Sequence, residues 1–150
     1  MREHPDHHDA ELLLRLYDLR RESKLRQARE WYLREFRAES LEDFYKRYPI
    51  GSEENAFFRM VTSYWDMAAS IVNHGLIQEE FFFETTGEFF AVWEKVKHLV
   101  SPAREAYKNP FVWTNLESLV GKYEKWVAKR APGALETLRQ RLLSVPAKDG

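Results

Sequence analysis

The sequence predicts an all-α protein, an irregular antiparallel bundle of about six to eight helices. Three observations favour this fold class. No stretch alternates apolar and polar residues over the length of a strand. Six Gly and six Pro are too few for a fold rich in strands and turns, and the predicted helices are joined by short connections. At 150 residues, the chain is expected to form one domain, residues 1–150, with flexible ends at 1–8 and 146–150.

The first two helices are predicted over residues 9–22 and 24–37. One apolar stripe consists of Leu12, Leu16 and Leu19, and a second stripe, out of phase with the first, consists of Leu25, Ala28, Tyr32 and Phe36. A bend near Ser23 explains the change of face, because serine can cap the second helix. The alternative is one long helix that buries different faces along its length.

The next two helices have clear end signals. Ser40 precedes acidic residues at nearly the spacing of a capping box, and the short helix that it opens ends before Pro49. Ser52 is expected to cap a long helix over residues 53–74, and Gly75 follows where left-handed backbone commonly ends a helix. This long helix is apolar around most of its circumference, so it is expected to lie at the centre of the bundle.

Capping and proline signals divide the rest of the chain. A short amphipathic segment over 78–83 is followed by Thr85 and Glu88 at capping-box spacing, which predicts a helix from there to about residue 100. Further helix starts are predicted at Ser101-Pro102 for residues 102–108, at Asn109-Pro110 for 110–130, and after Pro132-Gly133 for a last helix ending near Val145.

A row of polar side chains on the 53–74 helix is the main departure from a plain core. At 100° per residue, five of them fall within a band of about 80°: Arg59, Ser63, Asp66, Ser70 and Asn73. Exposure to solvent, or pairing of Arg59 and Asp66 by neighbours, would explain the row. The functional interpretation is a polar groove for a partner or small ligand, with Arg59, Ser63, Asp66 and Asn73 as its binding residues.

No group of residues points to catalysis. His4, His7 and His8 lie near Glu11 at spacings that a metal could use, but bundle metal sites need paired Glu-x-x-His motifs that this chain lacks. Nucleophile elbows and glycine-rich phosphate loops are also missing. The sequence therefore predicts no catalytic residue, no metal ligand and no cofactor, and it favours a protein that is not an enzyme.

Composition and charge narrow the possible partners. The chain has no cysteine, which excludes disulfides and thiolate chemistry and fits a cytoplasmic location. No apolar run reaches the ~20 residues of a spanning helix, so membrane insertion is not expected. The net charge of −1 gives no general attraction to nucleic acid.

The near-zero net charge conceals a strong segregation along the chain. Residues 15–37 hold eight basic and four acidic side chains. Residues 38–94 hold three basic and eleven acidic side chains, and residues 95–150 hold eleven basic and five acidic ones. The middle is therefore acidic between basic flanks. Pairing within the molecule would explain this pattern, and the alternative is a basic surface of residues 15–37 that docks an acidic partner.

These features favour a helical protein-interaction or self-association module, with a protein partner or a second copy bound by helix faces. The 5 Trp, 7 Tyr and 10 Phe favour an apolar surface patch, because a core of this size is not expected to enclose them all. The alternative function is a small-ligand-binding or catalytic bundle with a polar pocket between helices around Arg59 and Asp66.

Three motifs in the middle of the chain carry a family resemblance: Asn73-His74-Gly75-Leu76-Ile77, Phe89-Phe90-Ala91-Val92-Trp93, and Asn109-Pro110 followed by Trp113-Thr114-Asn115-Leu116-Glu117. Over residues 52–130 the chain resembles a family of uncharacterised bacterial proteins, a domain of unknown function. The resemblance implies an all-helical fold and transfers no functional residue. Members often carry an N-terminal transmembrane helix, whereas residues 9–37 here are charged and amphipathic, so membrane association is not implied.

Overall fold

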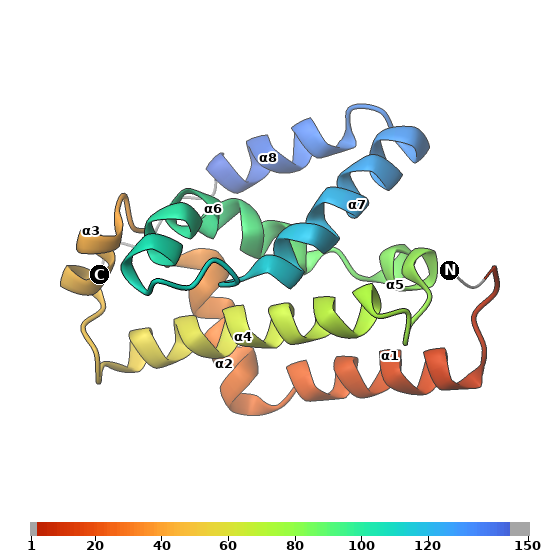
Figure 1. Ribbon diagram of the computed structural model, residues 1–150, viewed down its shortest axis with the longest axis horizontal. Helices are drawn as coiled ribbons and strands as arrows, with labels where there is room; N and C mark the ends of the chain where they lie inside the picture. The colour runs from red at the N-terminus through yellow and green to blue at the C-terminus, as the bar shows by residue number, and fades with distance from the viewer. Residues whose placement is uncertain (1–2, 145–150) are drawn as a thin grey trace.

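Eight helices and no strand form the part of the chain that the structure describes, residues 3–144 (Figure 1). The structure is a computed structural model. In chain order the helices are α1 (His7–Arg20), α2 (Ser23–Arg34), α3 (Leu41–Arg47), α4 (Glu53–Asn73), α5 (Glu79–Thr85), α6 (Glu88–Ala106), α7 (Thr114–Arg130) and α8 (Ala134–Ser144). The predicted all-α bundle is confirmed.

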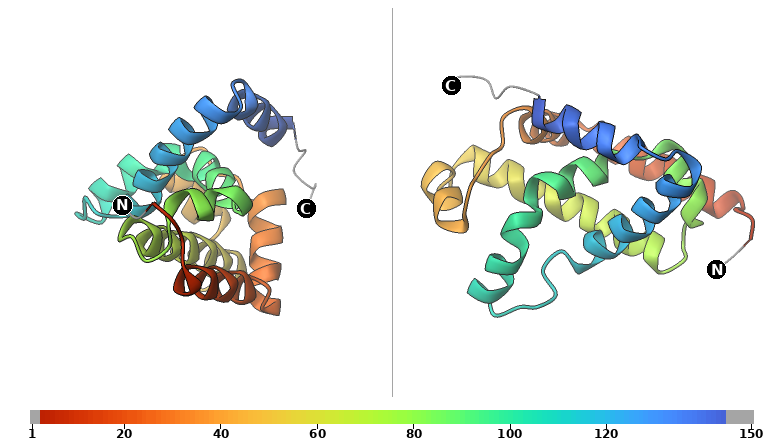
Figure 2. Two further views of the ribbon diagram at one scale, coloured as in Figure 1. Left: turned by 90° about the vertical axis from the view of Figure 1, so that its right-hand side faces the viewer. Right: turned by 90° about the horizontal axis from the view of Figure 1, so that it is seen from above.

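Helix α4 lies at the centre of the bundle, as its apolar circumference predicts. It packs against α2 and α7, and α1 runs alongside it (Figure 1). Ten of its residues are buried, among them Trp65 at 1% exposure. Helix α8 turns back from the end of α7 and lies at one edge of the molecule (Figure 2).

Most aromatic rings pack inside the bundle, in two groups. One group joins α2, α3 and α4 around Phe36 and Phe58, whose ring centroids lie 5.1 Å apart. The other joins α5, α6 and α7 around Phe89 and Tyr123, 4.9 Å apart. Of the aromatic side chains in residues 3–144, three are exposed: Tyr17, Tyr107 and Phe111. The rings therefore build the core, and most of the large apolar side chains that stay exposed on these residues are not aromatic.

The chain bends between α1 and α2, as predicted, but the capping residue differs. Glu22, not Ser23, caps α2: its carboxylate accepts hydrogen bonds from the backbone N–H groups of Lys24 and Leu25, both at 3.0 Å. These backbone bonds are the largest of the effects that lower the pKa of Glu22. A glutamate supplies two acceptor oxygens and a negative charge at the helix N-terminus, which explains why it takes this position from serine.

The helix predicted after Thr85 forms as α6 from Glu88, but the capping box predicted at Thr85 and Glu88 and the separate helix start predicted at Pro102 are wrong. Thr85 is the last residue of α5, and Glu88 turns toward Arg29 of α2 instead of completing a capping box. Pro102 lies inside α6, whose buried face continues through it to Ala103. Burial of this face outweighs the hydrogen bond that proline cannot donate.

Helix α7 begins at Thr114, four residues later than predicted. The side chain of Asn109 accepts a hydrogen bond from the N–H of Phe111 at 2.9 Å, so Pro110 belongs to a turn. Trp113 then has φ = 56°, in the left-handed region, at the residue that precedes the helix. No side chain of this segment caps α7.

Other predicted helix ends are confirmed. The Ser52 hydroxyl accepts a hydrogen bond from the N–H of Asn55, and Gly75 has φ = 79° just beyond α4. Ser40 caps α3 in the same way through the N–H of Asp43. The predicted end of the last helix near Val145, and residues 146–150, lie outside the described residues.

Side chains from distant helices complete two further helix ends. Asp9 of α1 is fully buried, and its carboxylate accepts a hydrogen bond from the N–H of Gln78, at the start of α5, at 2.6 Å. The Lys95 ammonium of α6 donates to the carbonyls of Tyr32, at 2.7 Å, and Leu33, at 3.2 Å, in the last turn of α2. Each charge has the sign that the helix dipole favours at that end.

Ion pairs join the basic flanks of the chain to its acidic middle. They link α2 to α6, α8 to α6, and α7 to α5 through Arg29–Glu88 at 2.8 Å, Arg139–Glu94 at 2.7 Å and Lys122–Glu79 at 4.0 Å. Part of the charge complementarity is therefore satisfied within the molecule.

Candidate functional site

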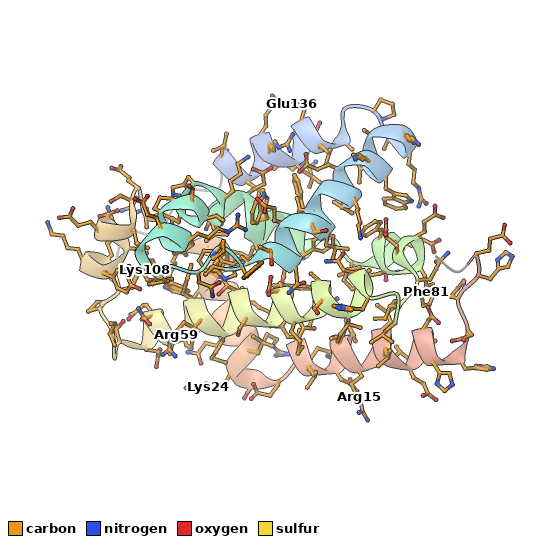
Figure 3. All side chains as sticks on the ribbon, viewed as in Figure 1. Arg15, Lys24, Arg59, Phe81, Lys108 and Glu136 are labelled. Atoms are coloured by element: carbon orange, nitrogen blue, oxygen red, sulfur yellow. The ribbon has the colours of Figure 1, made fainter. Side chains whose placement is uncertain are left out.

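The polar row of α4 divides into two parts in the structure. Arg59, in its N-terminal half (Figure 3), and Ser63, at its middle, line a cavity. Asp66 and Asn73, farther along the helix, contact α7 instead. The structure therefore does not bring the four predicted binding residues together in one site.

The cavity next to Arg59, here called the Arg59 pocket, has a volume of about 550 Å³. It lies between α3, α4, the C-terminal half of α6 and the segment before α7. Its lining residues are Leu41, Phe44, Tyr45, Asn55, Phe58, Arg59, Thr62, Ser63, Leu99, Tyr107 and Trp113. Sites for small molecules combine apolar and aromatic walls with a few polar groups in this manner.

Most polar groups of the Arg59 pocket are already engaged. Asn55 is 5% exposed; its amide nitrogen donates to the carbonyl of Tyr48 at 2.9 Å, and its amide oxygen accepts from Arg59 Nε at 3.1 Å. The hydroxyls of Thr62 and Ser63 donate to backbone carbonyls one turn earlier in α4. In contrast, the two terminal nitrogens of the Arg59 guanidinium have no partner among residues 3–144.

Aromatic contacts shape the walls of the Arg59 pocket. The Tyr45 and Tyr107 hydroxyls form a hydrogen bond that joins α3 to the residue after α6. Although the Tyr107 side chain is half exposed, partial loss of water around its hydroxyl, together with this bond, raises the pKa of Tyr107 to about 12. The Trp113 ring stands edge-on to Phe58, with centroids 5.9 Å apart. The pocket is therefore walled by uncharged rings with one cation, Arg59.

This arrangement can bind a ligand but does not activate a nucleophile. A catalytic serine needs a base that accepts its proton. Ser63, the serine of the pocket, donates its hydroxyl to a carbonyl of its own helix at 2.5 Å, and Thr62 does the same at 2.9 Å. Neither hydroxyl is bonded to a histidine or carboxylate in the described part of the chain.

Asp66 caps α7 from another helix. One carboxylate oxygen accepts a hydrogen bond from the N–H of Leu116 at 3.0 Å, and the other accepts from the side chain of Asn115 at 3.2 Å. Since the residues before α7 supply no side-chain cap, Asp66 satisfies an N–H group that would otherwise lack a helical partner.

Asn73 continues the same contact about two turns later in α4. Its amide nitrogen donates to the carbonyl of Asn115 at 2.9 Å, and its amide oxygen accepts from the Lys122 ammonium at 3.2 Å. Asp66 and Asn73 thus hold α4 to α7. The helical period alone identified the row, but it could not identify partners that lie more than forty residues away.

Sequence reasoning missed the ion pair between α2 and α6. Glu88 accepts two hydrogen bonds from the guanidinium of Arg29, both at 2.8 Å, and a third from the indole N–H of Trp65 at 3.0 Å. The hydrogen bond with Glu88 is the main reason that the pKa of Arg29 is raised. No local spacing signals a pair separated by 59 residues.

The N-terminal histidines do not assemble a metal site. Within residues 3–144, no group of three or more His, Asp or Glu side chains could hold a metal ion, and His4, His7 and His8 form no such group. Over the same residues, no helix combines the length and the apolar character that crossing a membrane requires.

Comparison with known proteins gives the family of the chain. No curated protein and no solved structure matches it. A family model described as a domain of unknown function matches residues 5–126. The match adds α1, α2 and α3 to the resemblance over 52–130 and ends at residue 126. The chain therefore belongs to the family named Domain of unknown function (DUF4760).

Proposed function

We propose that the protein binds a small planar anion in the Arg59 pocket. The observation that carries this function is the free end of the Arg59 guanidinium, which has no partner in the described chain and lines a cavity. A guanidinium offers two parallel N–H groups that fit a carboxylate or phosphate. Asn55 holds Nε, which fixes the orientation of the fork.

The walls of the pocket favour a flat ligand. Five of the lining residues are aromatic, so a ring inserted between them gains stacked and edge-on contacts. At about 30 Å³ for each water-sized atom, a volume of about 550 Å³ accommodates a ligand of up to about eighteen non-hydrogen atoms. The ligand class is therefore an aromatic compound with one anionic group.

Titration with 2-naphthoate tests this function. Its fluorescence anisotropy should rise on binding, and the neutral 2-naphthamide should bind more weakly. Arg59→Gln should raise the Kd about tenfold or more, because a hydrogen bond to a charged group contributes about 1.5–3 kcal/mol. Arg26→Gln, which removes an exposed cation of α2, is the matched control and should leave the Kd unchanged. Equal binding of acid and amide, or no binding at all, would contradict the proposal.

A second function, self-association, is supported by a different observation. Leu19 of α1 and Met67 of α4 are 47% and 43% exposed and lie around one shallow hollow with Met60. Methionine-rich surfaces adapt to partners. We propose that a second copy of the chain packs on this face. Light scattering at several concentrations should detect a dimer that Met67→Glu abolishes and Leu138→Glu, on the exposed surface of α8, does not; a monomer at all concentrations would refute it.

We also infer a cytoplasmic location, a bacterial source and a ligand other than nucleic acid. The support is the absence of cysteine, the resemblance to bacterial proteins and the net charge of −1. Fractionation of the native host, and a binding assay with nucleic acid at low salt, would test the first and third points.

A further inference from the structure

We infer a second ligand site, separate from the Arg59 pocket: a slot between α1, α4 and α5 that binds a medium-chain carboxylic acid. The slot has a volume of about 320 Å³. Apolar side chains from all three helices form its walls, among them Leu13, Leu16, Trp65 and Phe82. Helix α1 lies alongside α4 with α5 at its end (Figure 1), and residues of all three helices line the slot.

The slot contains a cation without an anion. The guanidinium of Arg20 lies 5.0 Å from the ring centroid of Tyr17 and 5.7 Å from that of Trp65. It forms no hydrogen bond or ion pair with any residue from 3 to 144. A guanidinium that lies on an aromatic face keeps its N–H groups free, because they point outward in the plane of the guanidinium. It can therefore donate two of them to one carboxylate.

A buried hydroxyl is the second, independent observation. Thr86 is 5% exposed and lines the slot, and its hydroxyl has no hydrogen-bond partner within the described chain. Side-chain oxygens that are fully enclosed all have partners among these residues. The Thr86 hydroxyl therefore keeps some accessible surface, and because Thr86 lines the slot, the hydroxyl can donate to a ligand oxygen there.

The chemistry of the slot selects an aliphatic carboxylate. One guanidinium and one hydroxyl match the two oxygens of a carboxylate, whereas a phosphate dianion needs more donors. The remaining walls are apolar and suit a hydrocarbon chain. At about 30 Å³ for each water-sized atom, the volume fits about ten non-hydrogen atoms, the size of an eight-carbon acid.

The rim of the slot allows entry from solvent. Leu14 and Tyr17 both line the slot and are 64% and 45% exposed. Their exposed apolar surface is unfavourable in water and would be covered in part by the bound acid. These contacts favour one extended acyl chain in the slot.

Calorimetric titration of the full chain with octanoate tests the site. We expect a Kd between about 10 μM and 1 mM, the range for a ligand of this size. Arg20→Gln should raise the Kd at least tenfold, and Thr86→Val, which keeps the shape of the side chain, at least threefold. Octanol, which lacks the charge, and butanoate, which lacks the chain, should each bind at least tenfold more weakly than octanoate.

Two control variants distinguish binding in the slot from binding at a neighbouring cation or in the Arg59 pocket. Arg21→Gln removes the neighbouring cation of the same helix end, which also lies over Tyr17 at 5.4 Å but does not line the slot. Arg59→Gln removes the cation of the Arg59 pocket. Both should bind octanoate within twofold of the unchanged chain, and circular dichroism should show the same helix content for every variant.

Four results would overturn the inference. The first is that octanoate does not bind up to about 10 mM, and the second is that octanol binds as tightly as octanoate. The third is that Arg20→Gln and Arg21→Gln weaken octanoate binding equally, and the fourth is that Arg59→Gln is the one variant that weakens it. The last result would assign the acid to the Arg59 pocket. If Arg20→Gln fails to fold, Thr86→Val decides the question, because a binding site in this slot requires its hydroxyl.

Discussion

The ion pair between α2 and α6 provides a quantitative test of how the bundle is held together. Glu88→Gln keeps the shape of the side chain and removes its charge. In the structure, Glu88 accepts two hydrogen bonds from Arg29 and one from Trp65. The Arg29 and Glu88 side chains are 19% and 18% exposed, so water replaces these bonds only in part.

The expected loss follows from these contacts. Removing one partner of a buried pair costs about 3–5 kcal/mol, because the other charge remains buried. Glutamine keeps one acceptor oxygen, which in the place of Oε2 still accepts from Arg29 Nε and from Trp65, whereas the second bond from Arg29 is lost. The remaining exposure also lets water reach the guanidinium. We therefore expect Glu88→Gln to lower the free energy of unfolding by about 2–3 kcal/mol. A domain stable by about 5–15 kcal/mol still folds after this loss.

Urea denaturation followed by circular dichroism measures this loss, and a double-mutant cycle isolates the pair. Glu88→Gln, Arg29→Gln and the double variant should give a coupling energy of about 2 kcal/mol. The matched control is the exposed pair Arg34–Glu30 on α2, whose side chains are 61% and 66% exposed and whose coupling should be below about 0.5 kcal/mol. Equal coupling energies for the two pairs would refute the reasoning.

Three further predictions concern single residues. Asp66→Ala should lower the free energy of unfolding in urea by about 1–2 kcal/mol, because α7 loses its cap. Ser70→Ala, the control on the same helix, should lower it by less than about 0.5 kcal/mol. Equal losses for the two variants would contradict the capping role. Burial lowers the pKa of Lys95 from 10.5 to about 8, so the unfolded chain binds more protons between these pH values. Stability should therefore rise with pH across that window relative to Lys95→Met, and parallel pH profiles would contradict this. Gly121→Ala, in the middle of α7 with open space around the new methyl group, should raise the free energy of unfolding by about 0.5–1 kcal/mol. Gly75→Ala, at φ = 79°, should lower the free energy of unfolding by about 1 kcal/mol. Thermal unfolding that ranks the two variants in the opposite order would disprove this expectation.

Local signals predicted those parts of the fold that depend on neighbouring residues. Ser52 and Gly75 mark the ends of α4 correctly, because a hydroxyl cap and a left-handed glycine act within a few residues of the helix end. The change of apolar stripe near Ser23 located the bend for the same reason. The identity of the cap was missed because the Glu22 side chain reaches the same N–H groups.

The helix ends that the sequence predicts wrongly are those where contacts with distant residues override local signals. Glu88 has the spacing of a capping residue, but a bidentate contact with Arg29 is stronger than a bond to a helix end. Pro102 continues α6, because the face that ends in Ala103 is buried against the rest of the bundle. Neither contact can be derived from a local pattern.

In the candidate site, too, local patterns predict some features, and contacts with distant segments decide the others. The helical period placed Arg59, Ser63, Asp66 and Asn73 on one face, and the structure confirms that α4 is a helix over all four. Which of them line a cavity depends on α3, α6 and the segment before α7, whose positions no periodicity gives. Arg20 and Thr86 were missed because an arginine in a charged helix and a threonine in a turn have no distinguishing local pattern.

Helix ends that are completed by other helices change how the molecule can open. The amide hydrogens at the start of a helix normally exchange fast, because the first turn frays. The N–H of Gln78 is held by Asp9 of α1, and the N–H of Leu116 is held by Asp66 of α4. Fraying of α5 or α7 at its first turn therefore requires α1 or α4 to move as well, so local opening spreads between segments that are distant in sequence.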